Sequence, residues 1–378
     1  MGTDDQDDPP GSSQPKPDRE IIEIAAAALK KGKVIRDKDG VFGLEYLRFH
    51  EHHRGVERGT VVTKTAVIRG FPHIRRIFTL EAGIRHNIGS DGRLYIEEKI
   101  DGFNVRIAHI DGKVFGFSRG GFLDAFVTEK AREMRLERFF KANPGFILCG
   151  EMIGNTPYTA PSEKFDVKLF IFDIDMGDGR LMLPKERYGL LDKFGLDYPP
   201  MLGCIDTSDF ASMRKIALAL NKARKEGMVM KSEDRSKVLK YVTPNSDIED
   251  IAQSSSLFFD MPIGFFHQRV LRSAFFIKDF ALDRDEYGKR IGEAFYRGLE
   301  KSIAAAGSGE AVGEEFEILI KEPAVWGDIR RHMSKEVKIE ELWKREEKDG
   351  RTRIRFQKIF KRTTKLLSSY SKGKGIVD

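Results

Sequence analysis

The dipeptide Asp111-Gly112 restricts the fold of this chain more than any other feature of its sequence. The segment Phe103–Ile110 alternates in character before it, and the strand-like residues 113–117 follow directly. Asp-Gly between two such segments favours a two-residue turn that joins paired antiparallel strands. The sequence therefore predicts an antiparallel β-hairpin in the central part of the chain.

Other short apolar segments in the same region extend this pattern. We expect further strands at residues 94–96, 146–153, 168–174, 227–230 and 237–242. Helical spacing of apolar residues lies between some of them, most clearly around residues 209–224. Helices mixed with locally paired strands predict an α+β fold with antiparallel sheets.

The 378 residues exceed one ordinary hydrophobic core, so we expect several domains. Composition divides the chain into a polar tail expected to be disordered (1–18), a small N-terminal module (19–64), the α+β domain (65–243), a phenylalanine-rich helical domain (244–310) and a basic C-terminal domain (311–378). The helical pattern breaks at Gly307-Ser308-Gly309 and resumes from Glu314. Helical C-terminal domains are therefore expected, and the phenylalanines form either core or an oligomer interface.

Charge is unevenly distributed along the chain. The formal net charge is only +6, but basic residues heavily outnumber Glu346, Glu347 and Asp349 between residues 344 and 374. Such an excess neutralises phosphates and releases counterions, which favours a nucleic-acid partner. A solvated helix face is the competing interpretation.

Several classes of site find no support in the sequence. Cys149 and Cys204 cannot form a disulfide framework and lack metal-ligand spacing, and the adjacent His52 and His53 are poorly placed to share one ion. No apolar run approaches the ~18–20 residues of a membrane span. The N-terminus also lacks a secretory pattern. We expect a cytoplasmic protein that makes no membrane contact.

The segment Glu97-Glu98-Lys99-Ile100-Asp101-Gly102 carries the strongest chemical signal. Lysine followed by x-Asp-Gly at a strand end places an amine beside a tight turn, where a ligand can approach the backbone. By itself, such a match marks a surface turn more often than a nucleophile.

Further motifs follow it in order: Ser118-Arg119-Gly120, Cys149-Gly150-Glu151, Phe170-Ile171-Phe172-Asp173, Glu226-Gly227-Met228-Val229-Met230-Lys231 and Lys237-Val238-Leu239-Lys240. Taken singly, Glu151 and Glu226 would be interpreted as solvent-facing strand ends. Phe172 would be interpreted as a core residue, and Lys240 as a charge that protects an edge strand from pairing. Their joint order and spacing resemble the covalent nucleotidyltransferase superfamily of ATP-dependent ligases and capping enzymes.

The resemblance implies a role for each position. Lys99 would attack the α-phosphorus of ATP, which requires a neutral amine. Glu151 and Glu226 would hold Mg²⁺, with Mn²⁺ as the alternative, while Lys240 supplies fixed positive charge. Phe172 would stack on adenine. The catalytic residues are thus expected to be Lys99, Glu151, Glu226 and Lys240.

The expected nucleotide site is larger than this catalytic set. It comprises Glu97, Glu98, Lys99, Asp101, Gly102, Asn104, Arg119, Glu151, Phe172, Glu226, Lys237 and Lys240. Many ligases carry two alternating lysines in the fifth motif, but here Tyr241 and Val242 follow Lys240. The second charge would have to come from Lys237, Lys231 or elsewhere.

The segments outside these motifs indicate which members of the superfamily the chain resembles. DNA ligases and capping enzymes continue into an OB-fold, whereas Pro244 here leads into the phenylalanine-rich helical segment. The whole chain, including Tyr46-Leu47-Arg48-Phe49 and Ile68-Arg69-Gly70-Phe71-Pro72-His73-Ile74, resembles the homodimeric ATP-dependent RNA ligases of archaea.

This resemblance implies ATP-grasp-like antiparallel sheets in an adenylylation domain at 65–243 and dimerisation through 244–310. It also implies an RNA partner whose 5′-phosphate and 3′-hydroxyl ends are sealed, or circularised, through lysyl-AMP and an adenylylated RNA end. Two alternatives remain open, a ligase for DNA ends or nicks and a non-catalytic RNA-binding protein.

Overall fold

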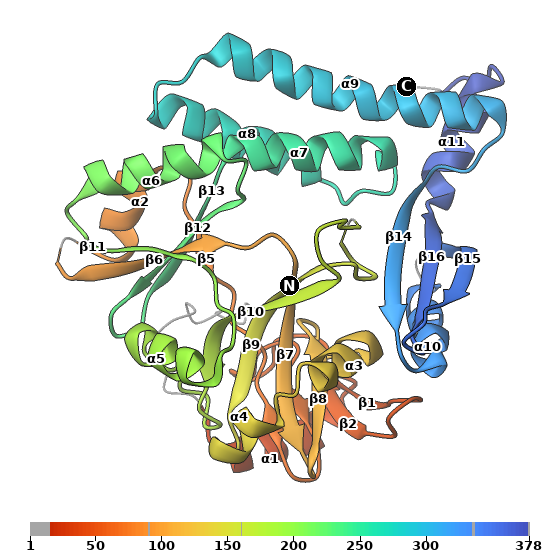
Figure 1. Ribbon diagram of the computed structural model, residues 1–378. Helices are drawn as coiled ribbons and strands as arrows, with labels where there is room; N and C mark the ends of the chain where they lie inside the picture. Colours follow the sequence, from red (N-terminus) through yellow and green to blue (C-terminus); the bar gives the residue numbers. More distant parts are fainter. Residues whose placement is uncertain (1–15, 90, 160, 335–336, 377–378) are drawn as a thin grey trace, which may run out of the picture.

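The computed structural model describes residues 16–89, 91–159, 161–334 and 337–376 and has the predicted α+β architecture (Figure 1). The described strands form four sheets, and their pairs are antiparallel except where β13 (Val238–Val242) runs parallel to β5 (Arg75–Arg76). The predicted disordered tail falls almost entirely on residues 1–15, outside the described part. Among the described residues, no helix combines the length and apolar character needed to cross a membrane.

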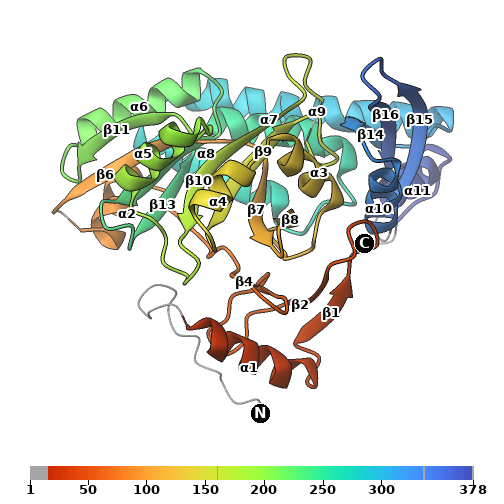
Figure 2. The ribbon, with the colours of Figure 1, turned by 60° about the horizontal axis from the view of Figure 1, so that its bottom comes forward.

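The N-terminal module packs one helix against a small sheet and lies on the side opposite the long helices (Figure 2). Helix α1 (Asp18–Leu29) buries Ile21, Ala25 and Ala28. The sheet order is β1 (Val34–Lys38), β2 (Glu45–Phe49), β3 (Val61–Val62) and β4 (Val67–Ile68). This sheet continues past the boundary expected at residue 64.

The first central sheet contains the predicted hairpin. Its order is β10 (Val167–Asp175), β9 (Ile147–Gly154), β7 (Phe103–Ile110) and β8 (Lys113–Ser118). Asp111 and Gly112 have φ angles of 48° and 79°, as a tight turn between twisted strands requires. The hairpin prediction is confirmed.

The second central sheet has the order β11 (Met201–Asp206), β6 (Arg93–Lys99), β12 (Gly227–Ser232), β13 and β5. Shorter helices pack around the two sheets: α2 (Leu80–Asn87), α3 (Ala125–Glu133), α4 (Glu137–Ala142), α5 (Pro184–Phe194) and α6 (Phe210–Lys222). Helix α6 confirms the helix expected around residues 209–224.

The Lys-x-Asp-Gly motif joins the two central sheets. Lys99 ends β6 in one sheet, and Phe103 begins β7 in the other. A Cβ atom on Gly102 would lie 2.5 Å from the carbonyl oxygen of Met152, so this crossing requires glycine. The motif therefore places Lys99 where the two sheets meet.

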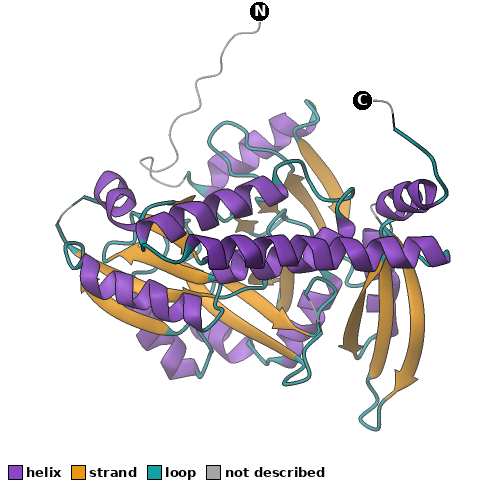
Figure 3. Cartoon of the chain, turned by 90° about the horizontal axis from the view of Figure 1, so that it is seen from above, coloured by secondary structure: helices purple, strands orange, loops and turns teal. Residues whose placement is uncertain are grey.

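The phenylalanine-rich segment is helical, as predicted, and consists of α7 (Pro244–Ser254), the 3₁₀ turn η1 (Ser255–Leu257), α8 (Phe265–Asp279) and α9 (Arg284–Ser308). These helices lie across the central sheets, and α9 extends to the C-terminal unit (Figure 3). Phe276 is buried and stacks on Tyr241 of β13 at 5.3 Å between ring centroids. Part of the cluster is therefore core.

The C-terminal unit corrects one expectation. The helix predicted from Glu314 is instead β14 (Gly313–Ile320), followed by α10 (Pro323–Met333), β15 (Lys338–Glu346), β16 (Thr352–Ile359) and α11 (Lys361–Ser371). Phe316, Ile318 and Ile320 are buried at a period of two, but buried Leu319 between them obscured the alternation in the sequence. The basic residues 344–374 consequently occupy two strands and a helix rather than one helix face.

Candidate active site

A cavity of about 490 Å³ lies where the two central sheets meet. Predicted site residues on its walls are Glu97, Glu98, Lys99, Gly102, Asn104, Arg119, Glu151, Phe172 and Lys240. Residues Asp328, Ile329 and His332 of α10 also line it, so the C-terminal unit forms part of the same cavity. Sequence patterns gave no signal for α10, because its approach to the cavity depends on tertiary packing.

Lys99 and Glu226 are held together by strand register. Gly227 of β12 pairs with Lys99 of β6, which brings the adjacent Glu226 alongside, and Lys99 Nζ lies 2.6 Å from Glu226 Oε2. Burial by itself lowers the pKa of Lys99, but Glu226 and Glu151 outweigh it and raise that pKa above its ordinary value. The free site therefore keeps this lysine charged.

Two more carboxyl groups lie near Lys99: Glu151 lines the cavity, whereas Asp101, like Glu226, is not among its lining residues. Burial raises the pKa of Glu151 to about 7, and Glu226 adds to the effect even though Lys99 opposes it. Burial and Glu226 also raise the pKa of Asp101 to about 6. Carboxylates held this close retain their protons more readily, and they provide oxygen atoms of the kind that Mg²⁺ prefers.

Positive charge gathers opposite these carboxylates. Lys240 pairs in register with Arg76 of β5, and burial together with Arg76 and Lys99 lowers the pKa of Lys240 to about 8. Arg119 also faces Lys240 closely enough to contribute to this shift. Arg76 was missed in the sequence because it belongs to none of the motifs.

Phe172 and Asn104 both line the cavity. Phe172 is partly exposed on the cavity wall, and its ring packs edge-on against Phe71 at 5.1 Å. The side-chain oxygen of Asn104 is buried and has no hydrogen-bond partner among the described residues. An unpaired buried acceptor that lines a cavity is well suited to a polar ligand group.

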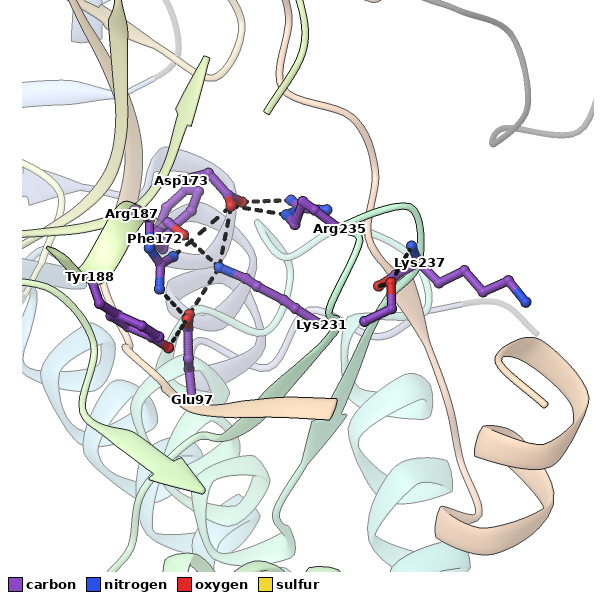
Figure 4. A network of polar contacts seen from close by, with 9 residues as sticks. Glu97, Phe172, Asp173, Arg187, Tyr188, Lys231, Arg235 and Lys237 are labelled. Atoms are coloured by element: carbon purple, nitrogen blue, oxygen red, sulfur yellow. Dashed lines mark hydrogen bonds and ion pairs between the residues drawn. The ribbon is translucent and has the colours of Figure 1, made fainter. Parts of the chain in front are cut away.

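The side chain of Glu97 is engaged in a buried network of polar contacts. It is 1% exposed, and its carboxylate pairs with Arg187, with Lys231 at 2.9 Å and with the hydroxyl of Tyr188 at 2.6 Å (Figure 4). Glu98, its neighbour on β6, pairs with Lys225 at 2.9 Å. Both glutamates were expected at the nucleotide site, and both reach the cavity wall already paired.

The structure does not bring Lys237 to the cavity. Its amine donates to the carbonyl oxygen of Ile88 at 2.9 Å, and the side chain extends away from Lys231 (Figure 4). Lys231 itself is locked in the pairs with Glu97 and Asp173. The arginines that lie beside Lys240 in the folded chain are Arg76 and Arg119.

Comparisons with known proteins agree with this geometry. Residues 92–242 match the family model described as RNA ligase, and residues 253–374 match the model described as ligase Pab1020 C-terminal region. The structure matches the solved structure of an archaeal ATP-dependent RNA ligase with 30% identity and a TM-score of 0.83, over 94% of this chain and 96% of that one. The chain belongs to the family of archaeal ATP-dependent RNA ligases.

Two other relatives of this ligase carry different descriptions. A protein of Aquifex aeolicus proposed to be an ATP-dependent DNA ligase is 30% identical, with a TM-score of 0.86, over 94% of this chain and 100% of its own. An uncharacterized protein of Methanocaldococcus jannaschii is 31% identical over 361 residues, covering 90% of this chain and 91% of its own.

The two family models divide the ligase much as its fold does. The RNA ligase model spans β6 to β13 and so includes Lys99, Glu151, Phe172, Glu226 and Lys240. The C-terminal model begins within α7 and ends after α11. Membership of this family, predicted from the ordered motifs, is confirmed.

Proposed function

We propose that this RNA ligase works through covalent adenylylation of Lys99. One observation carries the proposal: Lys99 Nζ lies 2.6 Å from Glu226, and Lys99 lines a cavity together with Glu151, Lys240 and Phe172. A nucleophilic amine, acidic groups, fixed positive charge and an aromatic ring are what transfer of a nucleotide to lysine requires.

The first step would form a phosphoramide bond between Lys99 Nζ and the α-phosphorus of ATP, with pyrophosphate leaving. The amine must lose its proton first, although Glu226 and Glu151 raise its pKa in the free site. Engaging these two carboxylates with other partners would lower the pKa of Lys99 again. Lys240, Arg76 and Arg119 are placed to balance phosphate charge, and Phe172 offers a face for adenine.

Glu151 and Glu226 fit a divalent cation. Among the described residues, no group of three or more His, Cys, Asp or Glu side chains forms a ready-made metal site. Mg²⁺ does not need one, because it commonly uses one or two carboxylates together with water and substrate phosphates. The bound ion would supply neutralising charge next to the phosphates.

RNA ends are the proposed substrate of the later steps. AMP would pass from Lys99 to an RNA 5′-phosphate, and a 3′-hydroxyl would then displace AMP, within one strand or between two. Basic residues of 344–374 are proposed to contact RNA phosphates, although Arg345, Arg351, Arg353 and Arg355 are already paired with acidic side chains. Exchanging the other basic residues for glutamate should weaken RNA binding and reduce its salt dependence.

A homodimer through the helical segment is also proposed. Helices α8 and α9 leave Leu271, Phe275, Tyr296 and Ile303 between 39% and 70% exposed. Apolar surface of this kind on adjacent helices is typical of subunit interfaces. Sedimentation at micromolar concentration should give twice the chain mass, and a monomeric mass would contradict the proposal.

The decisive experiment is incubation with α-labelled ATP and Mg²⁺, followed by a denaturing gel. Wild type should retain covalent label and Lys99→Ala should retain none, while the exposed control Lys113→Ala should label normally. Transfer from labelled enzyme to matched RNA and DNA strands then decides between RNA ends and the DNA ends suggested by the Aquifex relative. An unlabelled wild type, stripped of bound AMP, would instead favour a non-catalytic RNA-binding protein.

A further inference from the structure

Phe172 stands on a local irregularity in its sheet. Strand β10 pairs with β9 through Ile171 and Gly150 and then through Asp173 and Cys149, so Phe172 is an extra residue in the ladder. A β-bulge of this kind bends the strand and redirects a side chain, and bulges occur often beside active sites. Here the redirected ring lines the cavity. The orientation of the Phe172 ring therefore depends on the contacts that stabilise the bulge.

Two side chains from the neighbouring hairpin hold it. Lys231 of β12 donates a hydrogen bond to the carbonyl oxygen of Phe172 (Figure 4). Arg235, in the turn between β12 and β13, binds both carboxylate oxygens of Asp173, with Nε at 2.9 Å from Oδ1 and Nη2 at 2.6 Å from Oδ2. The side chains of Asp173 and Arg235 are 1% and 7% exposed, so this bidentate pair is almost dry.

Arg235 has a backbone conformation that a residue of its type rarely adopts. Its φ angle is 61°, in the left-handed region that glycine and asparagine occupy most readily. The turn keeps this shape through Asp234, whose carboxylate accepts from Ser232 Oγ at 2.6 Å and Ser236 N at 3.1 Å. A disfavoured conformation in a residue with a buried, bidentate side chain points to a role for that side chain.

We propose that Arg235 is a positioning residue of the nucleotide site: by clamping Asp173 it fixes the β10 bulge and thereby aims the ring of Phe172 at the adenine base. This rests on the proposed function of Phe172. Arg235 does not line the cavity, so its effect on the nucleotide passes through Asp173 and Phe172.

The test compares Arg235→Gln, Phe172→Ala and the double variant. ATP concentration is varied in the Lys99 labelling assay, and affinity for a non-hydrolysable ATP analogue is measured by calorimetry. Loss of an aligned stacking ring removes binding more than chemistry, so Arg235→Gln should raise KM about tenfold and change kcat less than about threefold. Arg235→Lys should recover only part of the loss, because an ammonium cannot reproduce the bidentate pair.

The double variant separates positioning from general structure. If Arg235 acts through Phe172, Arg235→Gln should weaken nucleotide binding much less in the Phe172→Ala background than in wild type. Equal, additive losses in both backgrounds, or wild-type KM in Arg235→Gln, would overturn the proposal. Arg180→Gln, which removes an exposed arginine–aspartate pair with Asp178, is the matched control. Calorimetry detects binding whether or not Lys99 becomes labelled, so failure of adenylylation is distinguished from failure of the clamp.

Discussion

Two charged clusters border the same cavity and differ in how their charges are balanced. The reactive cluster contains Lys99, Asp101, Glu151, Glu226 and Lys240, whereas the clamp cluster contains Glu97, Asp173, Arg187, Lys231 and Arg235. In the reactive cluster three carboxyl groups lie near Lys99, with Arg76 and Arg119 beside Lys240, whereas in the clamp cluster three cations surround two carboxylates. The clamp side chains are almost completely buried, whereas those of the reactive cluster are partly exposed, so the immediate partners of each group decide how it titrates.

The pKa values of Glu151 and Asp101 in the reactive cluster are raised, whereas those of Asp173 and Glu97 in the clamp cluster are lowered. Burial alone would raise all of them, and in the reactive cluster it raises the pKa of Glu151 to about 7. In the clamp cluster, Arg235 and Lys231 overcome burial and lower the pKa of Asp173, as Lys231 and Arg187 do for Glu97. The pKa of Glu151 in the reactive cluster therefore lies in the range where enzymes work, which suits a group proposed to change partners during a reaction. The carboxylates of the clamp cluster stay charged, which suits groups proposed to fix geometry.

The largest effect expected in this comparison is on catalysis. Glu226→Gln should slow labelling of Lys99 by on the order of 10²-fold or more, because it removes one of the two carboxylates proposed to hold Mg²⁺. The variant should also lower the pKa of Lys99, since Glu226 raises it. Residual labelling should therefore persist at lower pH than in wild type. Exposed Glu186→Gln is the control, and normal labelling by Glu226→Gln would contradict the assignment.

The two clusters should respond oppositely in stability. Asp173→Asn breaks a buried pair and should reduce the free energy of unfolding at pH 8 by about 3 kcal/mol or more. A lowered carboxyl pKa contributes stability above its unfolded value, which is lost as pH falls through the folded one. Glu151 has a raised pKa, so its contribution is lost as pH rises through about 7. Glu151→Gln should therefore leave stability at pH 8 unchanged or increased. Urea unfolding of both variants measures this.

A smaller effect is expected in the pH dependence of kcat/KM for adenylylation. Deprotonation of Lys99 favours activity as pH rises. Below about 7 Glu151 gains a proton, which should steepen the acid limb, and above about 8 Lys240 becomes neutral, which should make activity fall again. Lys240→Arg keeps its charge and should move the alkaline limb to higher pH. An alkaline limb that stays in place would show that Lys240 does not determine it.

The smallest effect is expected at Lys237. Its amine binds the Ile88 carbonyl outside the cavity, so Lys237→Ala should change KM for ATP by less than about twofold. Arg76→Gln should raise it severalfold, because Arg76 lies beside Lys240. The reverse order of effects in the labelling assay would restore Lys237 to the nucleotide site.

By itself, the sequence determined the features that depend on neighbouring residues. The turn at Asp111-Gly112, strand β7 and the helical character of residues 244–310 follow from local backbone preference and side-chain periodicity. The ordered motifs also identified the family, because the lysine, the glutamates and the phenylalanine stand along this chain in the order and at the approximate spacing that resemble the family. The same local method failed at β14, where buried Leu319 interrupts the alternation.

Only the tertiary structure decided which distant charges share a cavity. Arg76 stands beside Lys240 through parallel pairing of β5 with β13, and Arg235 reaches Asp173 because a turn in one sheet folds onto a bulge in the other. Lys237 belongs to the right motif but points away. The physical reason is that a pKa, an ion pair and the orientation of a ring depend on distances between groups and on their burial in the folded structure. Separation along the chain specifies neither.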